Sequence, residues 1–234
     1  MLQIENLAAG YGDAIALDGI SLVVPDHQIV AIFGANGAGK TTLIRTIAGI
    51  IRPWRGRILW HGQDIAGLPS HQVCNLGIGQ VAEGRQVFPS LSVAENLDLG
   101  AMLPRARASR AATLRRVLEM FPRLAERRTQ AAGTLSGGEQ QMLAIGRCLM
   151  GHPDLILFDE PSLGLTPAIV QQVLGIVRQL NGEGLTCVLV EQNVAASLSL
   201  SALGYVLENG QIAASGPGPE LLNDDRIRRA YRGL

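Results

Sequence analysis

The feature that most limits the fold of this chain is a glycine-rich segment that directly follows an apolar one. Residues 28–33 have the composition of a strand buried on both faces. Residues 34–41 read Gly-Ala-Asn-Gly-Ala-Gly-Lys-Thr, which fits GxxxxGK[ST] at every fixed position. A helical pattern follows to about Gly49. A strand, a glycine loop and a helix in this order predict a phosphate-binding loop in an α/β protein.

The single lysine of the chain lies inside this loop. Of the 20 basic residues, 19 are arginine and the other is Lys40. A slim ammonium is therefore kept at a position where a planar guanidinium would not do the same job. Backbone N–H groups of such a loop cradle the α and β phosphates of ATP, Lys40 is expected to reach the β and γ phosphates, and the Thr41 hydroxyl is expected to bind Mg²⁺. The loop residues predicted to contact ATP are Gly34, Asn36, Gly37, Ala38, Gly39, Lys40, Thr41 and Thr42.

A second apolar strand ends in two acids. Residues 154–158 are followed by Asp159 and Glu160. Asp159, at the tip of the strand, is predicted to hold Mg²⁺ through water, and Glu160 to polarise the water that attacks the γ phosphate. Paired acids after a strand can also cap the next helix, and the phosphate loop earlier in the chain is what favours the catalytic interpretation.

A third motif, Leu-Ser-Gly-Gly-Glu-Gln-Gln at residues 135–141, resembles the LSGGQ signature of ABC ATPases. A serine N-cap and two glycines that open a helix make a second anion cradle. One ATP needs one phosphate loop, so two cradles predict that two subunits meet head to tail, with each nucleotide between the Lys40 loop of one and the Ser136 loop of the other. The residues predicted to contact ATP from this side are Ser136, Gly137, Gly138 and Glu139.

The resemblance to ABC ATPases covers nearly the whole chain and implies roles for four further positions. Tyr11 is expected to stack on adenine. Glu83 stands where the family usually has the Q-loop glutamine, and its carboxylate can accept from a metal-bound water but cannot donate. Gln192 stands where most members have the switch histidine, so we expect it to contact the γ phosphate in catalysis without titrating. Thr166 replaces the usual D-loop aspartate.

The order of elements predicts the fold class, an α/β ABC-type P-loop NTPase with a mainly parallel wound sheet, an antiparallel β-rich N-terminal edge and an inserted helical subdomain. We expect one domain over residues 1–234. Residues 1–88 and 150–234 would form its core, and residues 89–149 the helical subdomain that carries the signature. Strands are expected at residues 2–7, 20–24, 28–33, 154–158, 186–190, 205–207 and 211–214, and helices after Gly39, after Ser136 and at residues 168–180.

Several segments resemble the F-type ATP-binding subunit of branched-chain amino-acid uptake systems. They are residues 83–85, 87–89, 191–193, 205–210 and the tail 228–233. The resemblance implies ATP hydrolysis that drives uptake. Its partners would be a second ABC ATPase subunit in a homo- or heterodimer, integral-membrane permease subunits and, indirectly, a solute-binding protein. A urea or other amide or amino-acid uptake ATPase is an alternative, because urea systems have a similar Glu-Gly-Arg loop.

Charge and hydropathy exclude some other classes. Acids and bases balance at 20 each, and the arginine-rich segment 105–128, which carries +6, has Phe121 as its one aromatic residue, so we expect no nucleic-acid partner. An ABC ATPase that acts on nucleic acid is the more distant alternative. No run approaches the roughly 20 apolar residues that span a bilayer, and the N-terminus lacks a secretory signal. We expect a cytoplasmic protein, peripheral on the inner face of the cell membrane, with three free cysteines.

Overall fold

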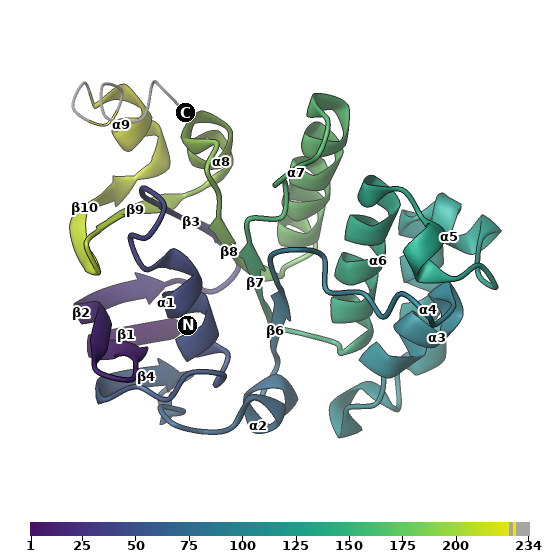
Figure 1. Ribbon diagram of the computed structural model, residues 1–234, viewed down its shortest axis with the longest axis horizontal. Helices are drawn as coiled ribbons and strands as arrows, with labels where there is room; N and C mark the ends of the chain where they lie inside the picture. Colours follow the sequence, from purple (N-terminus) through teal and green to yellow (C-terminus); the bar gives the residue numbers. More distant parts are fainter. Residues whose placement is uncertain (225–226, 228–234) are drawn as a thin grey trace.

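The chain builds two β-sheets with helices packed between and beside them (Figure 1). The structure is a computed structural model that describes residues 1–224 and 227. The larger sheet has six strands in the order β10-β9-β3-β8-β7-β6. Every neighbouring pair in it is parallel except β9 and β10. Its strands are β3 (Ile29–Phe33), β6 (Ile78–Val81), β7 (Leu155–Asp159), β8 (Thr186–Val190), β9 (Leu203–Glu208) and β10 (Gln211–Pro217).

The antiparallel N-terminal strands form a sheet of their own, in the order β2-β1-β4-β5. These strands are β1 (Leu2–Tyr11), β2 (Ala14–Val24), β4 (Arg55–Trp60) and β5 (Gln63–Asp64). Helix α1 (Lys40–Ile47) packs between the two sheets, and its Leu43, Ile44 and Ile47 are fully or almost fully buried there. The predicted β-rich N-terminal region is thus present as a second layer.

The central strands β3, β7 and β8 are mostly apolar and fully buried because both faces of the parallel sheet are covered. Leu155 and Leu157 of β7 face the α1 side, whereas Ile156 and Phe158 pack with the helices of the other side. These helices are α6 (Gly137–Met150) and α7 (Pro167–Gly182). Helices α8 (Val194–Leu200) and α9 (Gly218–Asn223) cover the part of the sheet near β9.

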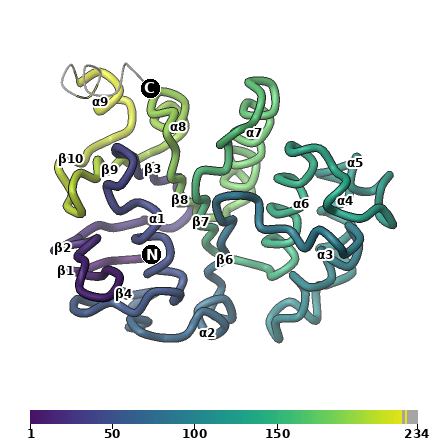
Figure 2. Tube along the Cα trace, viewed as in Figure 1, coloured from purple at the N-terminus to yellow at the C-terminus, as the bar shows by residue number. Residues whose placement is uncertain are grey.

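The predicted helical segment lies beyond the β6 edge of the sheet (Figure 2). It consists of α3 (Val93–Gly100), α4 (Arg110–Met120), α5 (Pro122–Glu126) and α6. These helices pack around one apolar interior, to which Val117 and Phe121 belong. Five arginines of the segment 105–128 form ion pairs within the chain, which reduces its free positive charge. The pairs are Arg105–Asp154, Arg110–Asp98, Arg116–Glu183, Arg123–Glu126 and Arg127–Glu139.

The sequence patterns did not predict β4, β5, β6, α2 (Ser70–Asn75), α8 or α9. The apolar run at 194–207 is divided between α8 and β9, and every helix among residues 1–224 is too short or too polar to cross a bilayer. The resemblance at residues 228–233 lies outside the described residues.

Candidate active site

A cleft of about 690 Å³ opens at the edge of the six-stranded sheet where the parallel strands end. Strands β3, β6, β7 and β8 all point their carboxyl ends toward this edge, so the loops that follow them meet there. The lining residues are Tyr11, Ala16, Asn36, Gly37, Gly39, Lys40, Thr41, Thr42, Glu83, Glu160, Leu163 and Gln192. Most of the residues predicted from the glycine loop, together with Glu160 after β7 and Gln192 after β8, therefore line one cleft.

The glycine loop owes its shape to positions that admit no side chain. Gly39 has φ 105°, and a Cβ there would lie 2.7 Å from the Ala16 carbonyl oxygen. A Cβ on Gly34 would lie 2.1 Å from the Leu207 carbonyl oxygen. The loop therefore turns tightly against β2 and β9 and delivers Lys40 to the first turn of α1.

Lys40 is folded back over the loop and is only 5% exposed. Its ammonium donates hydrogen bonds to the carbonyl oxygens of Gly34 at 2.9 Å and Ala35 at 3.1 Å. It also lies 3.6 Å from a carboxylate oxygen of Glu160. A buried ammonium held by two neutral carbonyls and one carboxylate can exchange these partners for phosphate oxygens.

Asp159 is 1% exposed and accepts a hydrogen bond from the Thr41 hydroxyl at 3.2 Å. Burial raises the pKa of Asp159 to about 6; the Thr41 hydrogen bond opposes this rise, and the nearby Glu83 and Glu160 carboxylates add to it. Crowded hard oxygen donors of this kind suit a divalent cation such as Mg²⁺. Among the described residues no group of three His, Cys, Asp or Glu side chains is placed to hold a metal by itself, so the substrate would have to complete the coordination.

Glu160 faces the cleft between two polar side chains. Its carboxylate is near the Lys40 ammonium on one side and accepts a hydrogen bond from the Gln192 amide at 2.7 Å on the other. Its backbone is in the left-handed region, at φ 47°. A carboxylate held in this way at a strand end can accept a proton from a water molecule in the cleft.

The loop at residues 135–141 lies elsewhere, and no member of it is among the described residues that line the cleft. Ser136 is the N-cap of α6, and Glu139 accepts from the Ser136 backbone N–H at 2.9 Å and donates its own N–H to the Ser136 hydroxyl at 3.4 Å. A hydrogen bond from the Ser136 hydroxyl lowers the pKa of Glu139. Gly137 is covered by Arg85, since a Cβ there would lie 2.9 Å from a guanidinium nitrogen.

Three other predicted positions are also located. Tyr11 lines the cleft with its side chain 51% exposed, so its ring is free to meet a base, and Glu83 lines the cleft after β6. Thr166 is the N-cap of α7 and is not among the lining residues. No sequence motif predicted a role for Glu191, which follows β8 directly. Glu191 is an acid at the end of a fully buried strand, as Asp159 and Glu160 are, and this pattern could have marked it as a candidate functional residue.

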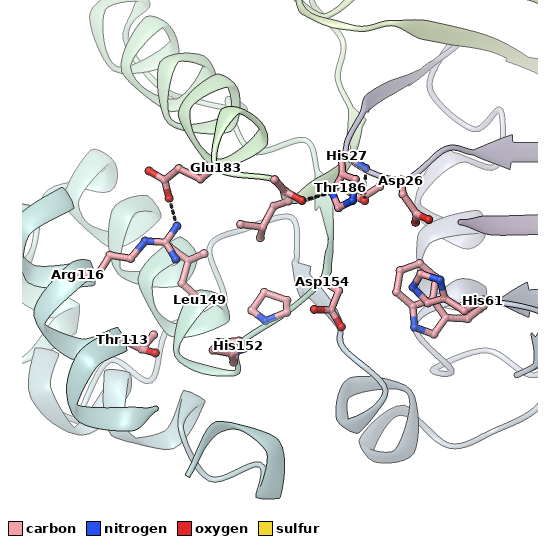
Figure 3. Close-up of a pocket in the computed structure, with 14 residues that line it drawn as sticks. Asp26, His27, His61, Thr113, Arg116, Leu149, His152, Asp154, Glu183 and Thr186 are labelled. Carbon is pink, nitrogen blue, oxygen red and sulfur yellow. Dashed lines mark hydrogen bonds and ion pairs between the residues drawn. The ribbon is translucent and has the colours of Figure 1, made fainter. Parts of the chain in front are cut away.

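A second cleft, of about 490 Å³, lies at the opposite edge of the sheet, where β3, β7 and β8 begin (Figure 3). Its charged groups have partners within the chain. Arg116 pairs with Glu183, Asp154 with Arg105 at 2.8 Å, and the N-terminal ammonium with Asp26. Three of the four histidines, His27, His61 and His152, also line it.

Comparison with known proteins agrees with this geometry. A model of the family "ABC transporter" matches residues 17–163. The chain is 47% identical over the full length of both proteins to BraG of Pseudomonas aeruginosa, a high-affinity branched-chain amino acid transport ATP-binding protein. It is 33% identical to LptB of Haemophilus influenzae, a lipopolysaccharide export system ATP-binding protein, over all of this chain and 97% of that one.

Among solved structures, the ADP conformation of MJ1267, an ATP-binding cassette of an ABC transporter, superposes with a TM-score of 0.87. That comparison covers 100% of this chain and 99% of the other, at 29% identity. The predicted α/β fold of an ABC-type P-loop NTPase with a mainly parallel sheet is therefore confirmed, and the antiparallel N-terminal strands form a separate sheet, not an edge of the parallel one. The chain belongs to the ABC transporter family of ATP-binding proteins.

Proposed function

We propose that this chain is the ATP-hydrolysing subunit that energises an ABC importer for branched-chain amino acids. One observation carries the proposal: Lys40, Thr41, Glu160 and Gln192 line a single cleft beside buried Asp159, in a chain that aligns over its whole length with BraG. The 47% identity to BraG favours import over the lipopolysaccharide export of LptB, to which the identity is 33%.

Binding of ATP uses the glycine loop and the exposed ring of Tyr11. Backbone N–H groups of the loop and the N-terminus of α1 receive the α and β phosphates. Lys40 exchanges its bonds to the Gly34 and Ala35 carbonyls for bonds to the β and γ phosphate oxygens. Tyr11 stacks on adenine, because its ring is at the mouth of the cleft and half exposed.

Thr41 and Asp159 would hold Mg²⁺, with Glu83 in contact through a water molecule. Mg²⁺ bound there would neutralise charge that develops on the phosphate oxygens. Burial raises the pKa of Asp159 to about 6, so Mg²⁺ bound there would favour the ionised carboxylate and displace a proton still bound to it.

Glu160 is the base of hydrolysis. Its carboxylate accepts a proton from the attacking water, whose oxygen forms a bond to the γ phosphorus as the bond to the ADP leaving oxygen breaks. Gln192 orients the carboxylate through the 2.7 Å hydrogen bond and contacts the γ phosphate with its neutral amide. Since an amide does not titrate, the pH dependence of turnover comes from other groups.

The Ser136 loop completes the site of a second ABC ATPase subunit, which is another copy or a related chain. Residues 89–149 form the subdomain that presents this loop, and residues 1–88 and 150–234 form the core of the same domain. Closure of the two subunits around ATP and reopening after hydrolysis drive conformational changes in the integral-membrane permease subunits. A solute-binding protein delivers the solute to these permease subunits. The subunit therefore acts on the cytoplasmic face of the membrane.

Reconstitution tests this function. The native chain is combined with candidate permease subunits in proteoliposomes, and ATP-dependent uptake of radiolabelled leucine, isoleucine and valine is measured, with the Glu160→Gln chain as the control. We expect uptake that requires ATP and is lost in the control. Uptake of urea alone would transfer the assignment to the amide systems, and DNA- or ribosome-stimulated ATPase without uptake would remove the transport assignment.

A further inference from the structure

The loop after β7 and the loop after β8 are joined by a buried carboxylate that the proposed mechanism does not use. Glu191 is 3% exposed. One of its oxygens accepts from the Ser162 backbone N–H at 3.0 Å, and the other accepts from the Ser162 hydroxyl at 2.7 Å. Each oxygen of the side chain thus accepts a hydrogen bond from the same residue of the neighbouring loop, and the Gln192 backbone N–H is a further donor to the carboxylate.

A buried carboxylate is costly unless its oxygens are hydrogen-bonded, so this pair constrains both loops. Burial raises the pKa of Glu191, and the two bonds from Ser162 offset part of that rise. Movement of Ser162 away from the end of β8 would break these bonds and leave the buried carboxylate with fewer donors.

The same two loops are joined at adjacent positions by residues of the cleft. The Glu160 backbone N–H donates to the Val190 carbonyl oxygen at 2.9 Å, and the Gln192 amide donates to the Glu160 carboxylate at 2.7 Å. Glu160 also has φ 47°, a conformation that a residue with a side chain keeps only when its surroundings enforce it. The Glu191–Ser162 bonds lie two residues beyond Glu160 in the same short segment.

We infer that Glu191 is a positioning residue for ATP hydrolysis. It fixes residues 160–162 against the end of β8, so that the Glu160 carboxylate stays aimed at the attacking water and within reach of Gln192. Leu163, which lines the cleft, belongs to the same loop. The inference rests on the proposed function, because it assigns Glu191 an effect on the catalytic step of that same site.

The test is steady-state ATPase kinetics of the purified chain with Glu191→Gln and with Ser162→Ala. An amide in place of the carboxylate can accept only one of the two bonds, and Ser162→Ala removes the hydroxyl donor. We expect kcat to fall by about 10- to 100-fold while KM and nucleotide affinity stay within about 2-fold, because misalignment affects the reacting groups and not the phosphate grip. Ser162→Thr, which keeps both donors, should restore most of the rate.

Two further measurements separate this role from a loss of folding. The double variant should be no slower than the slower single variant, since both changes break one contact. In a Glu160→Gln background, Glu191→Gln should cause no further loss of kcat, because the group that it positions is already inactive.

The matched control is Glu95→Gln. Glu95 also accepts from the N–H and the hydroxyl of one serine, Ser92, at 2.7 and 2.6 Å in the capping box of α3, but both bonds go to one oxygen and the side chain is exposed and lies outside the cleft. We expect its kcat to match the native value. Native kcat in both Glu191→Gln and Ser162→Ala, or parallel losses of kcat and nucleotide affinity, would overturn the inference. Absence of ATPase activity in the native chain would instead overturn the proposed function.

Discussion

The six-stranded sheet has one cleft at the edge formed by the carboxyl ends of its parallel strands and another at the edge formed by their amino ends. The two clefts differ in how far their ionisable side chains are buried. At the carboxyl edge the ionisable groups are buried: Lys40, Asp159 and Glu160 are 5%, 1% and 8% exposed. At the amino edge they are solvated, since Arg116 and Asp154 are 46% and 54% exposed. The second cleft has more ionisable side chains, yet its charges are paired within the chain and screened by water.

This difference shows which property marks a ligand site. Loops that follow parallel strands converge on one edge, and there the chain buries an ammonium held by two carbonyls and one carboxylate, and places the buried carboxylate of Asp159 near those of Glu83 and Glu160. A ligand that brings phosphate oxygens to the buried ammonium and a cation to the buried carboxylates would balance these charges. Charges at the other edge gain little from a ligand, because each already has a partner and water. Substitutions of the same type at the two edges can break or sharpen this contrast.

The largest contrast is expected between Glu160→Gln and Glu183→Gln. The first removes the base that accepts the proton of the attacking water, so kcat should fall by about 100- to 10,000-fold with nucleotide affinity retained. The second removes one partner of the Arg116 ion pair at the amino edge and should leave kcat unchanged. Phosphate release at saturating ATP measures both, and equal rates for Glu160→Gln and the native chain would sink the assignment of the base.

The next largest effect is on stability: Asp159→Asn is expected to raise the free energy of unfolding of the chain without nucleotide. Because the folded-state pKa of Asp159, about 6, is above the unfolded value near 3.8, the folded chain binds the proton more tightly and loses stability as the pH rises through this window. The variant without nucleotide should therefore be more stable by roughly 1–3 kcal/mol at pH 7 and show little gain at pH 4.

Denaturant unfolding at both pH values measures the Asp159 effect. Asp154→Asn at the amino edge is the control and should change the free energy of unfolding by no more than about 0.5 kcal/mol, since the side chain is exposed. Adding MgATP should reverse the order, because only the native chain binds it tightly. A stability gain that is the same at pH 4 and pH 7 would contradict the role of the charge.

The smallest effect is expected from Arg116→Ala, which removes the ion pair that links α4 to the end of α7. Exposed pairs contribute up to about 1 kcal/mol, so the free energy of unfolding should fall by no more than that, and the loss should shrink at high salt. ATPase activity should not change. A large loss of activity would mean that the amino-edge cleft communicates with the site.

The sequence was most informative where local pattern and burial coincide. Strands β3, β7 and β8 are five residues long, mostly apolar and buried at every position, so both their existence and the residues at their ends could be predicted. Strand β6 is short and buries only Ile78 and Val81, and β4 exposes its first three residues, so neither has a comparable pattern.

Contacts between distant residues could not be predicted from pattern. The raised pKa of Asp159 depends on burial and on the placement of Glu83 and Glu160, and the Glu191–Ser162 contact joins loops 29 residues apart. The signature loop is different: it was recognised by resemblance, and its absence from the Lys40 cleft of the same chain agrees with the expectation that it serves the nucleotide of a second subunit.

The most direct test of the account is the ATP affinity and phosphate release of the Lys40→Ala chain, measured beside Lys40→Arg. We predict that ATP affinity falls at least 100-fold and phosphate release drops to background in the alanine variant, and that arginine does not restore them, because its planar fork cannot take the place of the folded ammonium. Native affinity and native phosphate release in Lys40→Ala would contradict the placement of ATP in the carboxyl-edge cleft.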